Sequence, residues 1–414
     1  MAQRGALIDV RRFALAVEAV GVRGTPGSAI NPSGYSDFTA TADQEVLADG
    51  RQLGARKSAN ESHVGMKQCT MSFSAKLHEN TVTHLGAIIK CALGKQYNQT
   101  AMVLGVGSTN ALTKISSGVP DPIIKITYDT GRPDYIPVKT YTATDVNHAI
   151  LSRKGARTVT GVYNAKETST PAGACYAQDP TFDSQGSTLY AEVDQGAEPN
   201  SRSWQLQGLV PSKCELAFNM QDRVGFDVDL MGVDWSGPAA THANVTDQGE
   251  FDKEFLGYVW DCNIQDLGTP AAATQQPLVA IAALDLAPTW QPNLYSQGRV
   301  ASATLPGSNK NAWKQGKHFS KEIEITLDIV DTAWDTARQA GTKFQLFLTG
   351  YAGQPGQADT NVICIWFPEV ILNADPEEVD VNGIVGYKLK FLARECLDLT
   401  AAHQTHCAVA LFNS

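Results

Sequence analysis

Alternation of apolar and polar residues is the strongest local pattern in this chain. Between positions 321 and 329, acidic or hydroxyl side chains alternate with Ile and Leu. This period of two predicts a β-strand with one buried and one solvated face. Residues 66–77 alternate less regularly, with apolar side chains at 71, 73 and 75 opposing Ser72, Ser74 and Lys76. We therefore predict two amphipathic strands.

A helix signal follows each predicted strand. Thr81 is a suitable N-cap for apolar residues at helical spacing up to Leu93, and Gly94 is a suitable stop. After the second strand, Asp331 or Thr332 is a suitable cap for a segment that ends at Gly341. The sequence thus predicts two short helices, each directly after an amphipathic strand.

The strand and helix begin a longer pattern that occurs twice. Each occurrence continues with a strand, a polar turn, a second strand, a proline and a strand that starts Val-Gly-aromatic. These elements lie at 189–193, 204–210, Pro211 and 224–230 in the first occurrence, and at 344–350, 362–367, Pro368 and 385–391 in the second. Because the spacings before the two prolines agree to within one residue, we predict one fold used twice.

The two occurrences differ by a surplus in the first, at 95–186, which has strand patterns of its own at 123–128 and 158–163. We interpret it as an inserted small β domain. Clusters of Gly, Pro, Ala and Gln around strand patterns at 254–260 and 278–286 indicate a partly ordered connector. The predicted organisation is an N-terminal strand and arm (1–60), a first repeat (61–94 and 187–235), the insertion (95–186), the connector (236–318), a second repeat (319–395) and a C-terminal tail (396–414).

Composition narrows the classes of function. The chain has 414 residues, of which 43% are hydrophobic, so it can build sizeable cores. Its formal net charge of −10 gives no general attraction for nucleic-acid phosphates or for an anionic membrane surface. No stretch approaches the roughly 20 apolar residues that span a bilayer. The eight cysteines are scattered singly, which favours buried free thiols over disulfides or a zinc site.

Candidate catalytic and ligand-binding motifs are weak. The Gly105-Val106-Gly107 segment lacks the lysine of a phosphate-binding loop, so a plain turn is favoured. His403, His406 and Cys407 are close in sequence, but no second pair of ligands follows them. We therefore expect a solvated tail helix there rather than a metal site.

Two pairs of carboxylates, Asp227 with Asp229 and Glu322 with Glu324, lie two residues apart on predicted strands. Each pair shares one side of a sheet, where a solvated polar face is favoured over acid-base chemistry. No Gly-x-Ser-x-Gly or His-Glu-x-x-His motif occurs. We predict that the chain is not an enzyme and holds no cofactor and no metal.

The order of these elements resembles a known family. A short N-terminal strand with Glu18 precedes Gly24-Thr25-Pro26, a polar arm and a serine-bearing strand that leads into a helix. A glycine-bearing strand, a proline segment and the Val-Gly-aromatic strand follow. This arrangement resembles the tail tube proteins of long-tailed, siphovirus-like bacteriophages. The resemblance covers somewhat over half of the chain, and neither the surplus nor the connector belongs to it.

The resemblance implies a fold and a function. The expected fold is mainly β, with two tail-tube-type β-sandwich or barrel repeats, each with a short helix, plus the inserted small β domain. The expected function is that of the major tail tube subunit, whose rings stack into a hollow conduit for double-stranded DNA, which passes through without specific binding. Expected partners are other copies of the chain, a tape measure protein, a tail terminator and distal tail proteins. The expected location is the virion tail, assembled in the cytoplasm of the host bacterium.

In such a ring the solvated strand faces line the channel. This hypothesis assigns the channel wall to Glu322, Glu324, Thr326, Asp328, Ser72, Ser74, Lys76, Asp227, Asp229, Lys388 and Lys390. Acidic side chains there would repel DNA, whereas Lys or Arg contacts to phosphate would retain it. The alternative is that these residues face outward and the apolar residues form a layer between subunits.

The number of chains in a ring follows from the repeat. If a single-copy fold fills six positions, three two-copy chains form a trimeric ring with pseudo-sixfold symmetry, and a hexameric ring is the alternative. Two other functions remain open, namely a tail terminator or distal tail ring protein, and an all-β enzyme or carbohydrate-binding module.

Overall fold

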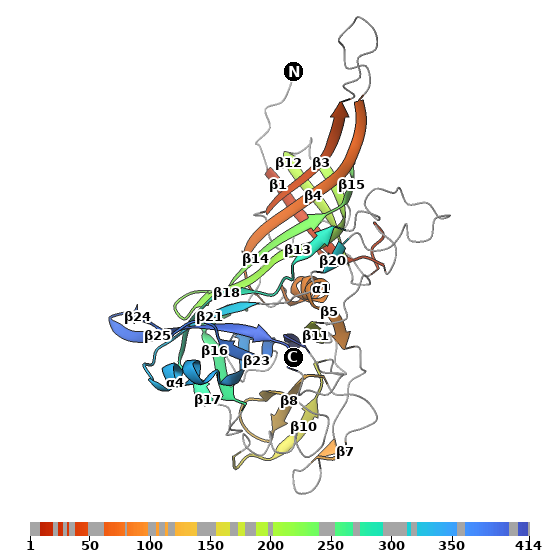
Figure 1. Ribbon diagram of the computed structural model, residues 1–414. Coiled ribbons are helices and arrows are strands. Elements are labelled where there is room, and N and C mark those ends of the chain that lie inside the picture. Colours follow the sequence, from red (N-terminus) through yellow and green to blue (C-terminus); the bar gives the residue numbers. More distant parts are fainter. Residues whose placement is uncertain are drawn as a thin grey trace, which may run out of the picture.

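The computed structural model describes residues 9–19, 24–27, 31–32, 38–48, 62–78, 81–97, 105–106, 112–114, 121–138, 155–165, 173–178, 188–197, 202–239, 253–267, 274–292, 313–315, 321–353, 361–396 and 405–412. Antiparallel strands dominate these residues, which confirms that the protein is mainly β (Figure 1). The strands form one sheet that is shared by the earlier and the later part of the chain, and two outer sheets that are joined to it.

The shared sheet runs without interruption from the first part of the chain into the second (Figure 1). Each strand pairs antiparallel with the next. Their order is β3 (Phe38–Ala48), β4 (Ser62–Lys76), β14 (Gly225–Gly232), β13 (Arg202–Asn219), β18 (Leu278–Asp285), β21 (Glu322–Leu327), β25 (Ile384–Arg394) and β24 (Glu377–Val381). The contact between β13 and β18 joins the two parts.

Two outer sheets are joined to the shared sheet, the first through β13 and the second through β23. The first contains β2 (Asn31–Pro32), β1 (Asp9–Val17), β12 (Leu189–Ala197), β13 and β15 (Asp234–Ala239). The second contains β17 (Thr274–Gln276), β16 (Phe255–Asp266), β22 (Lys343–Ala352), β23 (Val362–Leu372), β26 (Ala408–Phe412), β11 (Ala174–Gln178) and β5 (Gly94–Tyr97). The end of β23 also pairs with β25, so β13 and β23 each belong to two sheets.

The same order of pairing occurs in two sets of strands. In the first set the neighbours run β3, β4, β14, β13, β12 and β1. In the second set they run β18, β21, β25, β23, β22 and β16. Two strands inside the predicted connector (236–318), β16 and β18, therefore belong to the second set of strands.

Proline lies within both strands that change sheet. The pairing of β13 with β14 shifts register just after Pro211, and Pro368 lies inside the register shift between β22 and β23. A bulge tolerates proline because the ladder lacks a hydrogen bond there. Pro211 pairs with Leu230, whereas the corresponding pair in the second set is Leu372 with Phe391. The expected match of Pro211 to Pro368 is therefore wrong, because equal spacings conceal turns of unequal length.

Both predicted helices are confirmed. Helix α1 (Thr81–Leu93) packs against β13 and β11, and Gly94 follows it with a positive φ of 87°. Helix α4 (Ala333–Ala340) ends at Gly341, which adopts the left-handed conformation with φ 63°. At its start, Asp331 Oδ1 accepts a hydrogen bond of 2.8 Å from the backbone N–H of Ala333. Glycine permits both stops because it has no Cβ to clash at positive φ.

The insertion contains the predicted strands but is not separate from the second part of the chain. β8 (Ile123–Tyr128) pairs with β9 (Asp134–Pro137) and β10 (Val159–Tyr163) in a small sheet, and β6 (Gly105–Val106) pairs with β7 (Leu112–Lys114). Its first and last strands, β5 and β11, extend the second outer sheet beside β26. Apolar residues of the small sheet share a core cluster with Trp366 and Phe412.

One expectation for the ends of the chain needs correction. The expected solvated tail helix is wrong, because residues 408–412 form the buried strand β26 between β23 and β11. Cys407 is fully buried beside it, while His403 lies outside the described residues. The arm, whose composition is too polar to form a core of its own, contains β3, and Phe38 of this strand is buried against Phe13. The pair β19 (Trp290–Pro292) and β20 (Trp313–Gln315) follows β18.

Candidate functional site

One face of the shared sheet carries the side chains that the sequence assigns to a channel wall. In β4 and β14, Ser72 lies opposite Asp229 and Ser74 lies opposite Asp227. The alternate positions of β14, occupied by Phe226, Val228 and Leu230, are buried. Directly paired residues in antiparallel strands project to the same side of a sheet. These four polar side chains therefore form one cluster on the polar face, as the alternation predicts.

The second set of strands forms a corresponding cluster. Thr326 lies opposite Lys388, and Glu324 lies opposite Lys390. Glu324 Oε1 is 2.6 Å from Lys388 Nζ, and its Oε2 is 3.9 Å from Lys390 Nζ. The hydrogen bond to Glu324 raises the pKa of Lys388. One carboxylate is thus shared by two ammonium groups, so this part of the face is not dominated by negative charge.

Not all of the predicted channel residues lie within these clusters. Glu322 occupies the exposed first position of β21, opposite Leu392. Lys76 ends β4 and pairs with Asp222 at 3.6 Å, although both groups are exposed to solvent. Asp328 was expected to continue the alternation, but β21 ends at Leu327 and Asp328 lies just beyond it. Its backbone N–H still donates to the Pro277 carbonyl at 2.9 Å and its side chain is exposed, so its place on the channel wall stays a prediction.

The sequence reading missed two charged residues of β13. Lys213 Nζ lies 3.0 Å from Glu215 Oε2 and 3.6 Å from Asp227 Oδ2. The hydrogen bond to Glu215 raises the pKa of Lys213. Lys213 and Glu215 alternate with the buried residues Cys214 and Leu216. The sequence predicts a strand that ends before Pro211, whereas β13 continues to Asn219, so the alternation at 213–216 lies outside the predicted strand.

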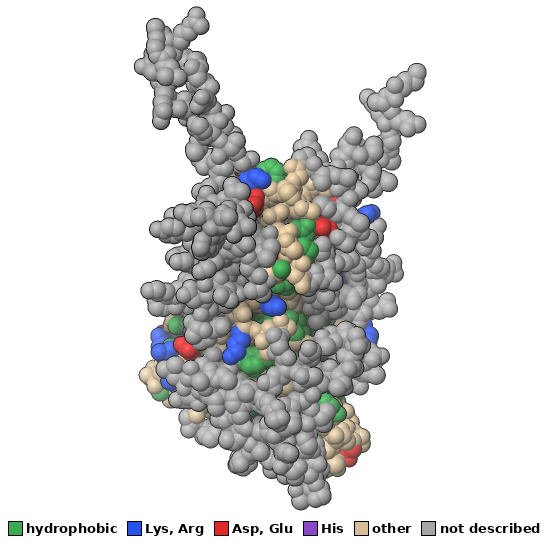
Figure 2. All heavy atoms as spheres, turned by 90° about the vertical axis from the view of Figure 1, so that its right-hand side faces the viewer, with side chains coloured by type: hydrophobic (Ala, Val, Ile, Leu, Met, Phe, Trp, Pro, Cys, Tyr) green, Lys and Arg blue, Asp and Glu red, His purple; other side chains and the backbone are tan. Residues whose placement is uncertain are grey.

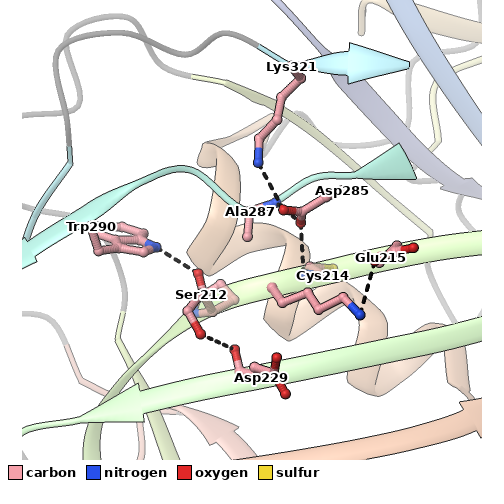
Figure 3. Close-up of polar contacts among 10 residues, drawn as sticks. Ser212, Cys214, Glu215, Asp229, Asp285, Ala287, Trp290 and Lys321 are labelled. Carbon is pink, nitrogen blue, oxygen red and sulfur yellow. Dashed lines mark hydrogen bonds and ion pairs between the residues drawn. The ribbon is translucent and has the colours of Figure 1, made fainter. Parts of the chain in front are cut away.

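The polar face crosses the junction between the two sets of strands (Figure 3). Asp285 Oδ1 accepts hydrogen bonds of 2.9 Å from the backbone N–H groups of Cys214 and Ala287. Its Oδ2 is 3.0 Å from Lys321 Nζ. Trp290 Nε1 donates to the carbonyl oxygen of Pro211 at 2.8 Å. Asp285 thus links β13 of the first set with β18 and the start of β21 in the second.

The opposite face of the shared sheet is buried within this single chain. Ile323, Ile325 and Leu327 have no exposed surface and join Phe73, Phe226 and other residues in one core cluster. Helix α1 and the outer sheets contribute residues to the same cluster. Since the chain itself covers these apolar residues, they do not need a second subunit to remove them from water. This observation weighs against the alternative in which they form a layer between subunits.

Within the described ranges, no three His, Cys, Asp or Glu side chains lie close enough together to hold a metal ion. All eight cysteines are buried and free, as predicted, and burial raises the pKa of the Cys69 thiol to about 12. Neither described helix is long and apolar enough to cross a membrane. On the face shown in Figure 2, basic and acidic side chains are scattered over the described surface.

Glu18, which belongs to the motif that carries the family resemblance, has a structural environment. Its carboxylate accepts hydrogen bonds of 2.9 Å from the N–H groups of Gly24 and Gly208, and it also accepts one from the Thr188 hydroxyl. Glu18 therefore fixes the 24–27 segment against β13. No protein-family model matches the chain, and a comparison with curated proteins likewise finds no match.

Proposed function

We propose that this chain is the structural subunit of a hollow tube, the major tail tube protein of a long-tailed bacteriophage. The observation that carries the proposal is the repeated pairing order of the two sets of strands, joined through β13 and β18 into one sheet. That sheet has an apolar face covered by the chain itself and a polar face whose described side chains are partly exposed. A curved sheet of this kind, continued from copy to copy, would make a closed wall with a polar lumen.

We further propose that the two sets are copies of one tube-type repeat and that three chains make a ring. Each chain would supply two of six equivalent positions, which gives pseudo-sixfold symmetry from a threefold assembly. Closing the sheet in a ring would also remove the two outermost edges, at β3 and at β24. Both are edges among the described residues, since β3 pairs only with β4 and β24 only with β25.

The charges on the polar face suit a conduit that does not retain DNA. Lys388 and Lys390 share Glu324, and Lys213 lies between Glu215 and Asp227. A lysine that is already paired with a carboxylate has less to gain from a phosphate, so passing DNA would release few counterions. The balance of charge on this face, more than a surplus of acid, would therefore keep the channel from binding DNA.

Electron microscopy of the purified protein tests the proposal. Long hollow tubes with three chains per ring are the expected result. Single rings that never stack would favour a tail terminator or distal tail ring protein. Discrete monomers at high concentration would contradict a tube subunit and favour an all-β enzyme or binding module.

Lumenal placement of the polar face has a separate test. Replacing Ser72 and Ser74 with Lys should slow DNA ejection from particles and make it strongly salt-dependent, because each new ammonium group can contact phosphate. Replacement of the same residues with Gln is the matched control for side-chain size. Ejection that stays fast in low salt with both lysines present would contradict the lumenal position.

A further inference from the structure

The chain contains two corresponding hairpin tips, and among the described residues a later segment covers the first of them but not the second. The first tip joins β13 to β14, and residues 253–257 of the later chain pack on it. Phe255 lies between two segments, because its N–H donates to the Leu77 carbonyl at 3.0 Å and its carbonyl accepts from Val224 N–H at 2.9 Å. Leu77, Val224 and Phe255 are all 0% exposed. The start of β16 therefore seals this tip.

Polar contacts complete the cover. Arg223 Nε lies 2.8 Å from Glu254 Oε2, and the Gly257 N–H donates to the Asp222 carbonyl at 2.8 Å. A Cβ at Gly257 would lie 1.9 Å from the Asn219 carbonyl oxygen, so the two backbones are in close contact. Next to this segment, β18 pairs with the edge of β13 over residues 215–219.

The second tip joins β24 to β25 and is uncovered among the described residues. Val385 precedes a glycine and an aromatic residue, as Val224 does, yet it is 53% exposed. Ala75 in β4 and Leu327 in β21 occupy the same register. Ile329 follows Leu327 by two residues, as Leu77 follows Ala75, yet Ile329 is 37% exposed. Val330 and Ile384 are 47% and 60% exposed. In Figure 1 this hairpin projects away from the rest of the molecule.

These four residues, Ile329, Val330, Ile384 and Val385, form what we call the tip patch. They account for most of the large exposed apolar side chains among the described residues, the others being Met220 and Tyr258. Clustering of exposed apolar groups at one place marks an interaction surface more than scattered single residues do. The segment that covers the first tip indicates what kind of segment would cover the tip patch.

The segment that corresponds to the start of β16 is the start of β1. Asp9 pairs with Ala197 at the end of β12, and Phe255 pairs with Ala352 at the corresponding end of β22. The ladder of β1 is continuous, whereas that of β16 shifts register between Phe255 and Trp260, so the match refers to the partner residues at the strand ends and not to equal spacing along the chain. The residue before Phe255 is Glu254, which pairs with Arg223, and the residue before Asp9 is Ile8. Ile384 corresponds to Arg223, because each directly precedes the Val-Gly-aromatic segment of its strand. The ion pair of Arg223 with Glu254 at the first tip thus corresponds to two isoleucines. Ile384 takes the place of Arg223, and Ile8 takes the place of Glu254.

We propose that the tip patch is the docking site for a second copy of this chain, which places the segment leading into its β1 on the patch. Ile8 of that copy contacts Ile384, as Glu254 contacts Arg223 inside one chain. The second copy's β3 continues the shared sheet at β24, as β18 does at β13. This inference rests on the proposed function for its biological meaning, but the docking itself depends only on the match between the two tips.

A charge swap tests the match directly. Ile384→Arg should raise the protein concentration needed for assembly by at least about tenfold, since it buries a cation in an apolar contact. Adding Ile8→Glu to that variant should return the concentration to within about threefold of wild type, because it recreates the ionic pair of the covered tip. Analytical ultracentrifugation measures assembly, and circular dichroism verifies the fold. Tyr258→Arg is the control, because it removes an exposed apolar side chain outside the patch.

The outcomes separate this inference from the tube proposal. Hollow tubes from the Ile384→Arg variant at wild-type concentrations would overturn the docking site and leave the tube function intact. Failure of Ile8→Glu to restore assembly would overturn the pairing with the β1 segment. If the wild type forms open chains of copies without tubes and the swap behaves as expected, the docking site stands and the tube function fails.

Discussion

The Val-Gly-aromatic strands β14 and β25 occupy the same place in the two sets of strands but carry opposite charges on the polar face. β14 presents Asp227 and Asp229 opposite serines, whereas β25 presents Lys388 and Lys390 opposite Thr326 and Glu324. Their buried positions are apolar in both strands. The comparison teaches that the alternating buried residues determine how the strands pair. The charge of the polar side chains can be reversed, provided that a neighbouring strand supplies the opposite charge.

The two sets also differ in what covers their outer sheets. The small sheet of the insertion packs on the second outer sheet, where Arg132 lies 3.3 Å from Asp261 and the ring of Tyr135 lies 4.8 Å from that of Phe412. At the base of the small sheet, Asp121 is buried and accepts a hydrogen bond from the Ala165 N–H. The following predictions test these differences, from the largest expected effect to the smallest.

The largest effect should come from Asp121. Burial raises the pKa of this carboxyl to about 7, so the folded small sheet favours the neutral acid. The unfolded chain loses that proton near pH 4, and stability should therefore fall as pH rises from about 4 to about 7, by up to about 4 kcal/mol. Asp121→Asn should remove this pH dependence. Hydrogen exchange of the β8 and β10 amides across this pH range measures it.

Asp129→Asn is the matched control for that experiment. The backbone N–H of Thr158 lowers the pKa of this exposed carboxyl in the same small sheet, so its contribution has the opposite sign. A pH dependence that survives Asp121→Asn unchanged would show that another group causes it.

Disrupting the junction should have the next largest effect. Asp285→Ala removes the carboxylate that accepts from the N–H groups of Cys214 and Ala287 and pairs with the Lys321 ammonium, which should destabilise the protein by about 3 kcal/mol. Asp285→Asn keeps an acceptor oxygen and should cost less. Urea unfolding measured by tryptophan fluorescence detects the change, since Trp260 stacks on Phe218 near this junction. Equal losses for both variants would mean that the N–H contacts contribute little.

The two hairpin tips provide a matched pair of substitutions. Val224→Ala should destabilise the monomer by about 2 kcal/mol, because a buried side chain leaves a cavity. Val385→Ala, the same change at the exposed tip, should cost less than about 0.5 kcal/mol in the monomer. Urea unfolding at low concentration compares them. Equal costs in the monomer would mean that the second tip is covered within one chain.

The smallest effect is expected from the charge clusters. Glu324→Gln should cost about 1 kcal/mol, because Lys388 and Lys390 lose a shared carboxylate that is only partly exposed. Asp229→Asn in the first set should be close to neutral, because Asp229 lies opposite a serine. A double-mutant cycle of Glu324→Gln with Lys388→Met measures the coupling. Coupling near zero would show that solvent screens the pair.

The sequence predicts those elements in which apolar and polar residues alternate strictly, and those helices that end at a glycine. The faces of β21 and β14, and the helix stops at Gly94 and Gly341, follow from local chemistry. β26 was missed because a run of apolar residues buried on both sides has no alternation to detect. β3 was missed because its small and polar side chains resemble a loop until β4 supplies the pairing.

The candidate site shows the same division. Alternation placed Ser72, Asp227 and Glu324 on one face, but no local pattern could reveal that Asp285 bridges β13 and β18. That contact depends on which distant strands meet, which is a property of topology. The sequence likewise could not predict the tip patch. The patch is recognised only when the exposed Val385 is compared with Val224, which is buried at the corresponding place in the first set of strands.

The position of β13 also affects how the chain must fold. This strand contacts β12, β14, β15 and β18, so its partners extend from Leu189 to Asp285 in the sequence. A ribosome that has released only the first set of strands presents β13 with an unpaired edge and an open hairpin tip. Such edges invite pairing with other nascent chains until the later strands emerge. Folding of the first set should thus be completed late in synthesis, and long-range pairing of this kind is slow.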